Sequence, residues 1–170
     1  LQSTLKGVFA VLGARELIQF FSATVDGVDK LNDLADATGA SVENLSALED
    51  IAVRTGTSVD TMADAIVKMN KSLADAKPGS DQAAAFDALG LSIKDLKALD
   101  PVEAFQKIAI ALQGFANDGN KARLVQELFG KSLRDVAPLL KDAAEAGKLV
   151  ATVTKEQAAE AEKFNKELFA

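Results

Sequence analysis

Cysteine and histidine are both absent from the 170 residues of this chain. Without cysteine the chain can form no disulfide, no thiolate nucleophile and no cysteine-ligated metal site. Without histidine it lacks the usual general base near neutral pH, the commonest metal ligand and every Ser-His nucleophilic pair. Because only carboxylates, lysines and hydroxyls remain, we predict that the chain is not an enzyme and that it binds no cofactor and no metal.

Tryptophan and tyrosine are absent as well, so phenylalanine supplies all of the aromatic residues. Phenylalanines without Trp or Tyr beside them are better suited to a hydrophobic core than to a platform for stacking bases. We therefore expect mostly buried positions for Phe20, Phe21, Phe86, Phe105, Phe115, Phe129 and Phe164.

Positive charge and long apolar runs are also scarce. The formal net charge is −6, and no cluster of Lys and Arg is long enough to follow a phosphate backbone, so we predict no direct binding of nucleic acid by this segment. The uncharged runs Leu17 to Val25 and Ile108 to Asn117 fall short of the roughly 18 apolar residues of a membrane-spanning helix. We predict no membrane span in this segment.

The composition that remains is typical of a folded domain, with 48% hydrophobic and 26% charged residues. No window alternates polar and apolar residues as a strand does, and the β-branched residues are scattered, so the predicted class is all-α. The chain begins at Leu1 and stops inside an unfinished helical pattern at Glu167 to Ala170. We interpret it as a fragment excised from a longer protein.

The strongest internal signal is a repeated Gly-x-Ser with apolar residues one and four positions after the serine. Glycine just past a helix end adopts the left-handed conformation at little cost, and the serine offers its hydroxyl to the free N–H groups of the next helix. Each copy is predicted to end one helix and begin another at a tight corner. The copies are Gly39 with Ser41, Gly56 with Ser58, Gly90 with Ser92, and Gly130 with Ser132.

Three further features mark the limits of helices. Asp100 is predicted to cap a helix that has proline at its first position, with Glu103 reaching back as in a capping box, and Thr154 with Gln157 suggests another helix start. The segment 77–80 is predicted to be a loop, and Pro138 is expected to divide its region into two short helices. Helices are expected near 3–38, 42–55, 59–76, 81–89, 93–99, 101–117, 120–129, 133–146 and 155–170.

These elements predict a bundle of short helices, with longer helices leading in and out. We divide the chain into a lead-in amphipathic helix over 1–38, a compact helical module over 39–147 and a lead-out helix over 148–170. The lead-in helix has the three-and-four spacing of a coiled coil, which indicates either a seam for self-association or an ordinary core-facing helix. The candidate seam residues are Val11, Ile18, Phe21, Val25, Val28 and Asn32, in a pattern that also includes Ala14 and Ala35.

Three blocks of the sequence, in order, resemble phage tail tape measure proteins. Residues 31–48 (LNDLADATGASVENLSAL) resemble the recurring block of that family. Residues 86–92 (FDALGLS) resemble its F-x-x-L-G-[IVL]-[ST] segment, and residues 127–132 (ELFGKS) resemble its [EL]-L-F-G-[KR]-S segment. Together the blocks span about residues 29 to 147. Their order and spacing are more specific than any one block, since each alone can arise from the chemistry of a helix corner.

The resemblance implies a structural protein of the phage or prophage tail. Such proteins lie in the lumen of the tail tube, set its length during assembly in the bacterial cytoplasm, and leave before or with the DNA at infection. The implied partners are tail tube and tail tip or assembly proteins, and a homo-oligomer is possible through the seam. The alternatives are a cell-wall-degrading module and a membrane-active module, built on an amphipathic segment from Leu5 to Phe21, that aids genome entry.

Several short motifs have a functional and a structural interpretation. Residues 130–132 (GKS) end like a phosphate-binding loop but lack its first glycine and a preceding strand, and residues 118–120 (DGN) begin like a calcium loop but lack its later ligands. We interpret both as helix caps. Glu43, Glu49 and Asp50, or Asp60 and Asp64, are candidate paired carboxylates for sugar hydrolysis. Acidic residues in a first helical turn explain Glu43 and Asp60 more simply.

Overall fold

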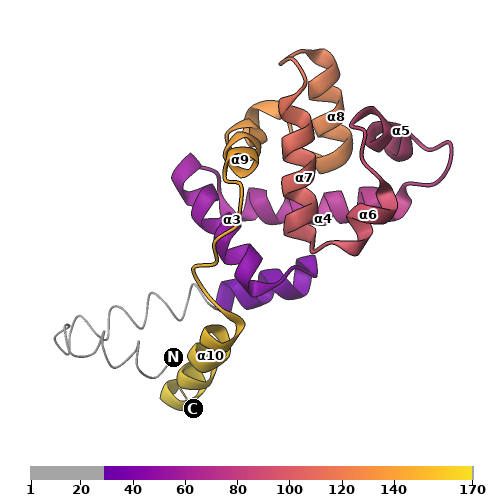
Figure 1. Cartoon of the computed structure of the whole chain (residues 1–170). Coiled ribbons are helices and arrows are strands. Elements are labelled where there is room, and N and C mark those ends of the chain that lie inside the picture. Colours follow the sequence, from indigo (N-terminus) through magenta and orange to yellow (C-terminus); the bar gives the residue numbers. More distant parts are fainter. Residues whose placement is uncertain (1–28, 170) are drawn as a thin grey trace.

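A computed structural model describes residues 29–169 of the chain (Figure 1). Over these residues the chain forms helices and connecting segments without a strand, which confirms the predicted all-α class. The helices are residues 29–38, α3 (Val42–Thr55), α4 (Val59–Asp75), α5 (Asp81–Ala88), α6 (Ile93–Ala98), α7 (Pro101–Gln113), α8 (Gly119–Phe129), α9 (Leu133–Glu145) and α10 (Lys155–Phe169).

Most helices begin at the predicted residue because a side chain immediately before them caps the first turn. The loop at 77–80 is present, and Ser80 caps α5 by accepting a hydrogen bond from Ala83 N at 3.1 Å. The predicted helix 101–117 is shorter than expected, since α7 ends at Gln113 and Gly114 follows it. The residues after Gly114 instead lead to Asp118, whose carboxylate caps α8.

The expectation that Pro138 separates two short helices is wrong. Pro138 lies inside the continuous helix α9, where it is exposed to solvent. Proline removes one backbone hydrogen bond, to the carbonyl four residues earlier, and disfavours a helix interior by about 3 kcal/mol. The buried face of α9, formed by Val136, Leu139, Leu140 and Ala143, requires the helix to continue through this point. Burial of that face outweighs the loss.

The expected capping box at the start of α7 forms only in part. Asp100 Oδ1 accepts a hydrogen bond from Val102 N at 2.9 Å, as a helix cap does. Its other oxygen, Oδ2, accepts from Ser41 N at 2.7 Å, so the carboxylate also holds the corner that begins α3. The side chain of Glu103 is exposed and forms no hydrogen bond within the described chain, so the predicted return bond to Asp100 is wrong.

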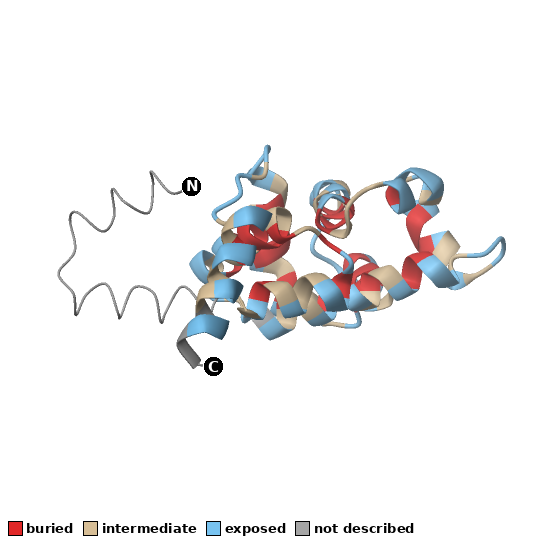
Figure 2. Ribbon diagram, turned by 90° about the horizontal axis from the view of Figure 1, so that it is seen from below, coloured by how far each residue is buried: buried red, intermediate tan, exposed pale blue. Residues whose placement is uncertain are grey.

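The core lies where α7 packs against α9 and where α4 packs against α8. Phe105 of α7 and Phe129 of α8 join the two pairs, with ring centroids 5.4 Å apart and planes tilted by 59°. These two rings and Phe86 are fully buried, whereas Phe115 and Phe164 are half-buried. Figure 2 shows the buried residues gathered on helix surfaces that face other helices. Phe20 and Phe21 lie outside the described residues.

Both ends of the described chain contribute to this core. Leu31 of the helical residues 29–38 is 3% exposed, and Ala158 of α10 is 1% exposed. In Figure 1 the chain leaves α9, runs along α3 without helical structure and then enters α10. Within residues 29–169, no helix combines the length and apolar character needed to cross a bilayer.

Candidate functional site

The predicted Gly-x-Ser corners all lie between two helices. The φ angles of Gly39, Gly56, Gly90 and Gly130 are 74°, 73°, 71° and 61°, which is the left-handed region that favours glycine. Each serine then caps the helix that follows. The Oγ atoms of Ser41, Ser58, Ser92 and Ser132 accept hydrogen bonds from the backbone N of Asn44, Thr61, Asp95 and Asp135 at 3.2, 3.0, 3.3 and 3.3 Å.

The fourth corner carries the sequence that resembles the end of a phosphate-binding loop. Gly130 ends α8 and Ser132 caps α9, so both residues are engaged in the corner. The Nζ atom of Lys131 is 3.3 Å from Asp64 Oδ2 on α4 and pairs with it. A β-carbon at Gly130 would lie 3.1 Å from Cγ of Lys68, which shows how closely α4 approaches this corner.

Most of the predicted seam lies outside the described residues, namely Val11, Ile18, Phe21, Val25 and Val28. Asn32 lies on the helical residues 29–38 and is half-buried. The same helix turns Leu31 into the core, and Ala35, which belongs to the seam pattern, packs against the core as well. At Ala35, therefore, the pattern serves packing within this chain.

The first group of candidate carboxylates lies on α3. The Oε1 atom of Glu43 accepts a hydrogen bond from Lys155 N at 2.6 Å, and Asp50 pairs with Arg54 at 2.9 Å. Glu49 is half-buried, and burial raises the pKa of its carboxyl, while the nearby charge of Lys30 acts in the opposite direction. Two of these three carboxylates thus have structural partners.

The second group, Asp60 and Asp64, lies one turn apart on α4. Asp60 is 3.8 Å from Lys30 Nζ, and Asp64 is the partner of Lys131. Both ion pairs are largely exposed, so each contributes little to stability. Asp118 likewise acts as a cap, with Oδ1 accepting from Asn120 N at 3.0 Å and from Lys121 N at 3.1 Å. Across residues 29–169, no three Asp or Glu side chains lie close enough to hold a metal ion.

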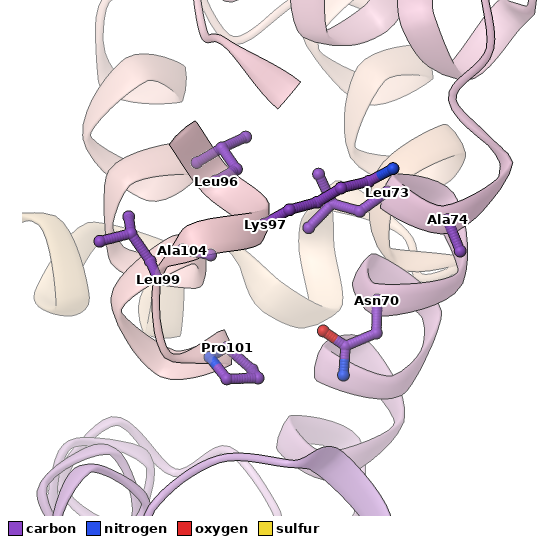
Figure 3. Close-up of a pocket in the computed structure, with 8 residues that line it drawn as sticks. All are labelled: Asn70, Leu73, Ala74, Leu96, Lys97, Leu99, Pro101 and Ala104. Atoms are coloured by element: carbon purple, nitrogen blue, oxygen red, sulfur yellow. The ribbon is translucent and has the colours of Figure 1, made fainter. Parts of the chain in front are cut away.

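A shallow cleft of about 430 Å³ lies between α4, α6 and α7 (Figure 3). Its lining is mostly apolar, with Lys97 extending from α6 toward Leu73 of α4. The lining residues are Asn70, Leu73, Ala74, Leu96, Lys97, Leu99, Pro101 and Ala104. None of these carries a carboxylate, a hydroxyl or a thiol, and Lys97 is the one titratable residue among them. The cleft can therefore receive an apolar side chain but does not bring two catalytic groups together.

Side chains that join distant helices were not predicted from the sequence. Asn70 Nδ2 donates to Thr38 O at 2.7 Å, and Gln106 Nε2 donates to Ala143 O at 3.0 Å and to Gly147 O at 2.6 Å. Each of these amides satisfies a carbonyl at the end of another helix. The sequence signal for such a residue is a polar side chain on the otherwise apolar face of a helical pattern. That signal indicates a buried polar contact but does not identify the carbonyl or amide that the side chain will meet.

Two buried serines are the clearest residues of this kind. Ser72 of α4 donates to the carbonyls of Glu127 and Leu128 at 3.2 and 3.3 Å. Ser46 of α3 contacts the segment that precedes α10, through hydrogen bonds to Thr152 and Val153. Both serines are almost fully buried, at 2% and 1% exposed.

Comparison of the chain with protein-family models, with curated proteins and with solved structures finds no match.

Proposed function

We propose that this chain is a structural, non-enzymatic module of a phage or prophage tail tape measure protein. In that role it lies in the tail tube lumen, acts through contacts with tail tube and tail tip or assembly proteins, and leaves when the genome is ejected. The observation that carries the proposal is the set of three ordered sequence blocks and their positions in the fold.

Each block coincides with a helix-to-helix junction. The first block, 31–48, contains the end of the helical residues 29–38, the Gly39 corner and the start of α3. The second, 86–92, contains the end of α5 and the cap Ser92, and the third, 127–132, contains the end of α8 and the cap Ser132. The resemblance therefore lies at the residues that determine where helices end and begin. Because corner chemistry alone can produce each block, the order and spacing of the three blocks are what support the proposal.

The decisive experiment alters the length of this module in the phage or prophage that encodes it. In-frame deletion of codons 42–145 should give uniformly shorter tails by negative-stain electron microscopy, and duplication of the same codons should give longer ones. The substitution Ile110→Ser, at an exposed position of α7, is the control that should leave tail length unchanged. Unchanged tail length in both length variants, or absence of the chain from purified tails by mass spectrometry, would overturn the proposal.

Self-association through the lead-in helix is proposed as a second property of the module. Sedimentation equilibrium of the 170-residue chain tests it beside the double variant Phe21→Asp, Val28→Asp. An oligomer whose variant is a folded monomer would support a seam between copies. A monomer whose variant unfolds would show that this helix packs within its own chain.

A further inference from the structure

The segment between α9 and α10, residues 147–154, crosses α3 without regular structure and is called the strap below. It begins at Gly147, whose φ of 64° ends α9, and its residues Lys148, Val150, Ala151 and Thr152 are exposed. Leu149 and Val153 are half-buried against the core. A segment without helical bonds must find other partners for its backbone N–H groups.

Ser46 of α3 supplies partners for two consecutive N–H groups of the strap. Its Oγ accepts hydrogen bonds from Thr152 N at 3.0 Å and from Val153 N at 3.1 Å. The same hydroxyl donates to Glu43 O at 2.7 Å and lies 3.3 Å from Val153 O. One buried hydroxyl thus makes most of the polar contacts between the strap and α3.

Glu43, one turn before Ser46, holds the start of α10. Its Oε1 accepts from Lys155 N at 2.6 Å, which satisfies one of the N–H groups left free at a helix start. Thr154 and Gln157 satisfy two more through a reciprocal capping box, with distances of 2.9 and 3.2 Å. The helix start is therefore capped partly from within α10 and partly from α3.

Apolar burial in this attachment comes mostly from half-buried side chains. Between Lys155 and Phe164, Ala158 is the single buried residue, whereas Ala161 and Phe164 are half-buried, as are Leu149 and Val153 of the strap. Half-buried side chains and one alanine methyl contribute less than the fully buried large side chains between α7 and α9. Because local opening free energies follow the local density of buried contacts, we expect the strap and α10 to open at a lower free energy than α7 and α9.

We propose that the strap and α10 open as one unit, leaving α3 while the helices from α3 to α9 stay folded, and that Ser46 controls this opening. Removing the Ser46 hydroxyl leaves the N–H groups of Thr152 and Val153 without a partner in the closed state, whereas in the open state water satisfies them. The closed state alone is therefore destabilised. This opening is independent of the tape measure proposal.

Hydrogen exchange followed by mass spectrometry on the 170-residue chain tests the proposal with Ser46→Ala. Amides of the strap and of the first turns of α10 should exchange at least ~10-fold faster than in the unmodified chain, the effect of one buried group left unsatisfied. Amides of α4, α7 and α8 should keep their rates. Unchanged exchange in the strap, or equal acceleration in every helix, would overturn the proposal.

The matched control is Ser72→Ala, which removes a second buried hydroxyl from the same chain. Ser72 only donates to carbonyls of α8, so its loss should accelerate exchange in α4 and α8 and leave the exchange rates of the strap and α10 as in the unmodified chain. If Ser46→Ala fails to fold, the exposed hydrogen bond from Lys155 N to the Glu43 carboxylate provides a second test. Glu43→Ala should accelerate exchange at Lys155, and Glu43→Gln, which keeps an acceptor oxygen, should restore part of the protection. Equal rates in these two variants would contradict the proposed role of the contact.

Discussion

The bundle from α3 to α9 and the C-terminal strap with α10 are held in place by different forces. In the bundle, Phe86, Phe105 and Phe129 are almost fully removed from water, and large aliphatic residues surround them. Over residues 147–164, the buried set is reduced to Ala158, and hydrogen bonds from Ser46 and Glu43 make the specific contacts. Large buried side chains thus hold one region together, whereas the other combines half-buried apolar residues with side-chain-to-backbone hydrogen bonds.

This difference predicts how the two regions respond to damage. Apolar burial is shared among many neighbours, so the loss of one large side chain weakens every helix that touches it. A hydrogen bond is local, and its loss is relieved when the segment concerned opens to water. Substitutions in the bundle should therefore lower global stability, and substitutions at the strap should act mainly on α10.

The largest effect is expected from Phe105→Ala. This change removes a fully buried ring that contacts Phe129, and it should lower the free energy of unfolding by about 3–5 kcal/mol. Urea denaturation followed by circular dichroism measures the loss. Ile110→Ala, on the same helix at a position that is 52% exposed, is the control and should change stability by less than about 1 kcal/mol. Similar losses in both variants would contradict the assigned core.

A smaller loss of stability is expected from substitution of the two glycines that flank α9, Gly130 before it and Gly147 after it. Gly130→Ala forces a side chain into the left-handed region and against Lys68, and it should lower the unfolding free energy by about 1–2 kcal/mol. Gly147→Ala meets no atom within 4 Å and adjoins the strap, so opening of the strap can relieve its strain. We expect a smaller global loss for Gly147→Ala, measured by urea denaturation. The reverse order would show that the strap is as firmly held as the bundle.

Thr154→Ala tests the capping box of α10. Loss of the cap should reduce the local stability of α10 by about 1 kcal/mol, because Gln157 N loses its acceptor. Hydrogen exchange should show faster exchange in the first turns of α10, while the urea midpoint of the whole chain changes little. A shift of the global midpoint as large as that of Gly130→Ala would mean that α10 unfolds only together with the bundle.

The smallest effect concerns pH and Glu49, which lies one turn after Ser46 on α3. Burial raises the pKa of this carboxyl in the folded chain, so the folded state binds the proton more tightly than the unfolded state. Its contribution to stability is fully present below the unfolded value of 4.5 and is lost as pH rises through the higher folded pKa. Glu49→Gln should therefore be slightly more stable than the unmodified chain at pH 7, by less than about 1 kcal/mol because the group is partly exposed. The gain should disappear below pH 4.5 in urea denaturation at a series of pH values. A variant less stable at pH 7 would show that attraction by Lys30 dominates.

The sequence by itself determined the class of the fold and the limits of most helices. A cap such as Ser41 or Ser58 bonds an amide three residues away, and a corner glycine such as Gly56 acts on the helix that it ends. These interactions are complete within a few residues, so their residue types can be recognised in order along the chain. The expectation that Pro138 ends a helix is wrong because a rule based on local residue types takes no account of the buried face on the opposite side of α9.

Only the tertiary structure decided which distant residues meet. Ser46 and Val153 are 107 positions apart, and Ser41 and Asp100 are 59 apart. A serine on the apolar face of a helical pattern can be recognised locally, but no local pattern identifies the remote amide that it bonds, because the partner arrives only when helices pack. The attachment of α10 and the second role of Asp100 follow from that packing, whose direction is set by the burial of large apolar side chains over the whole bundle.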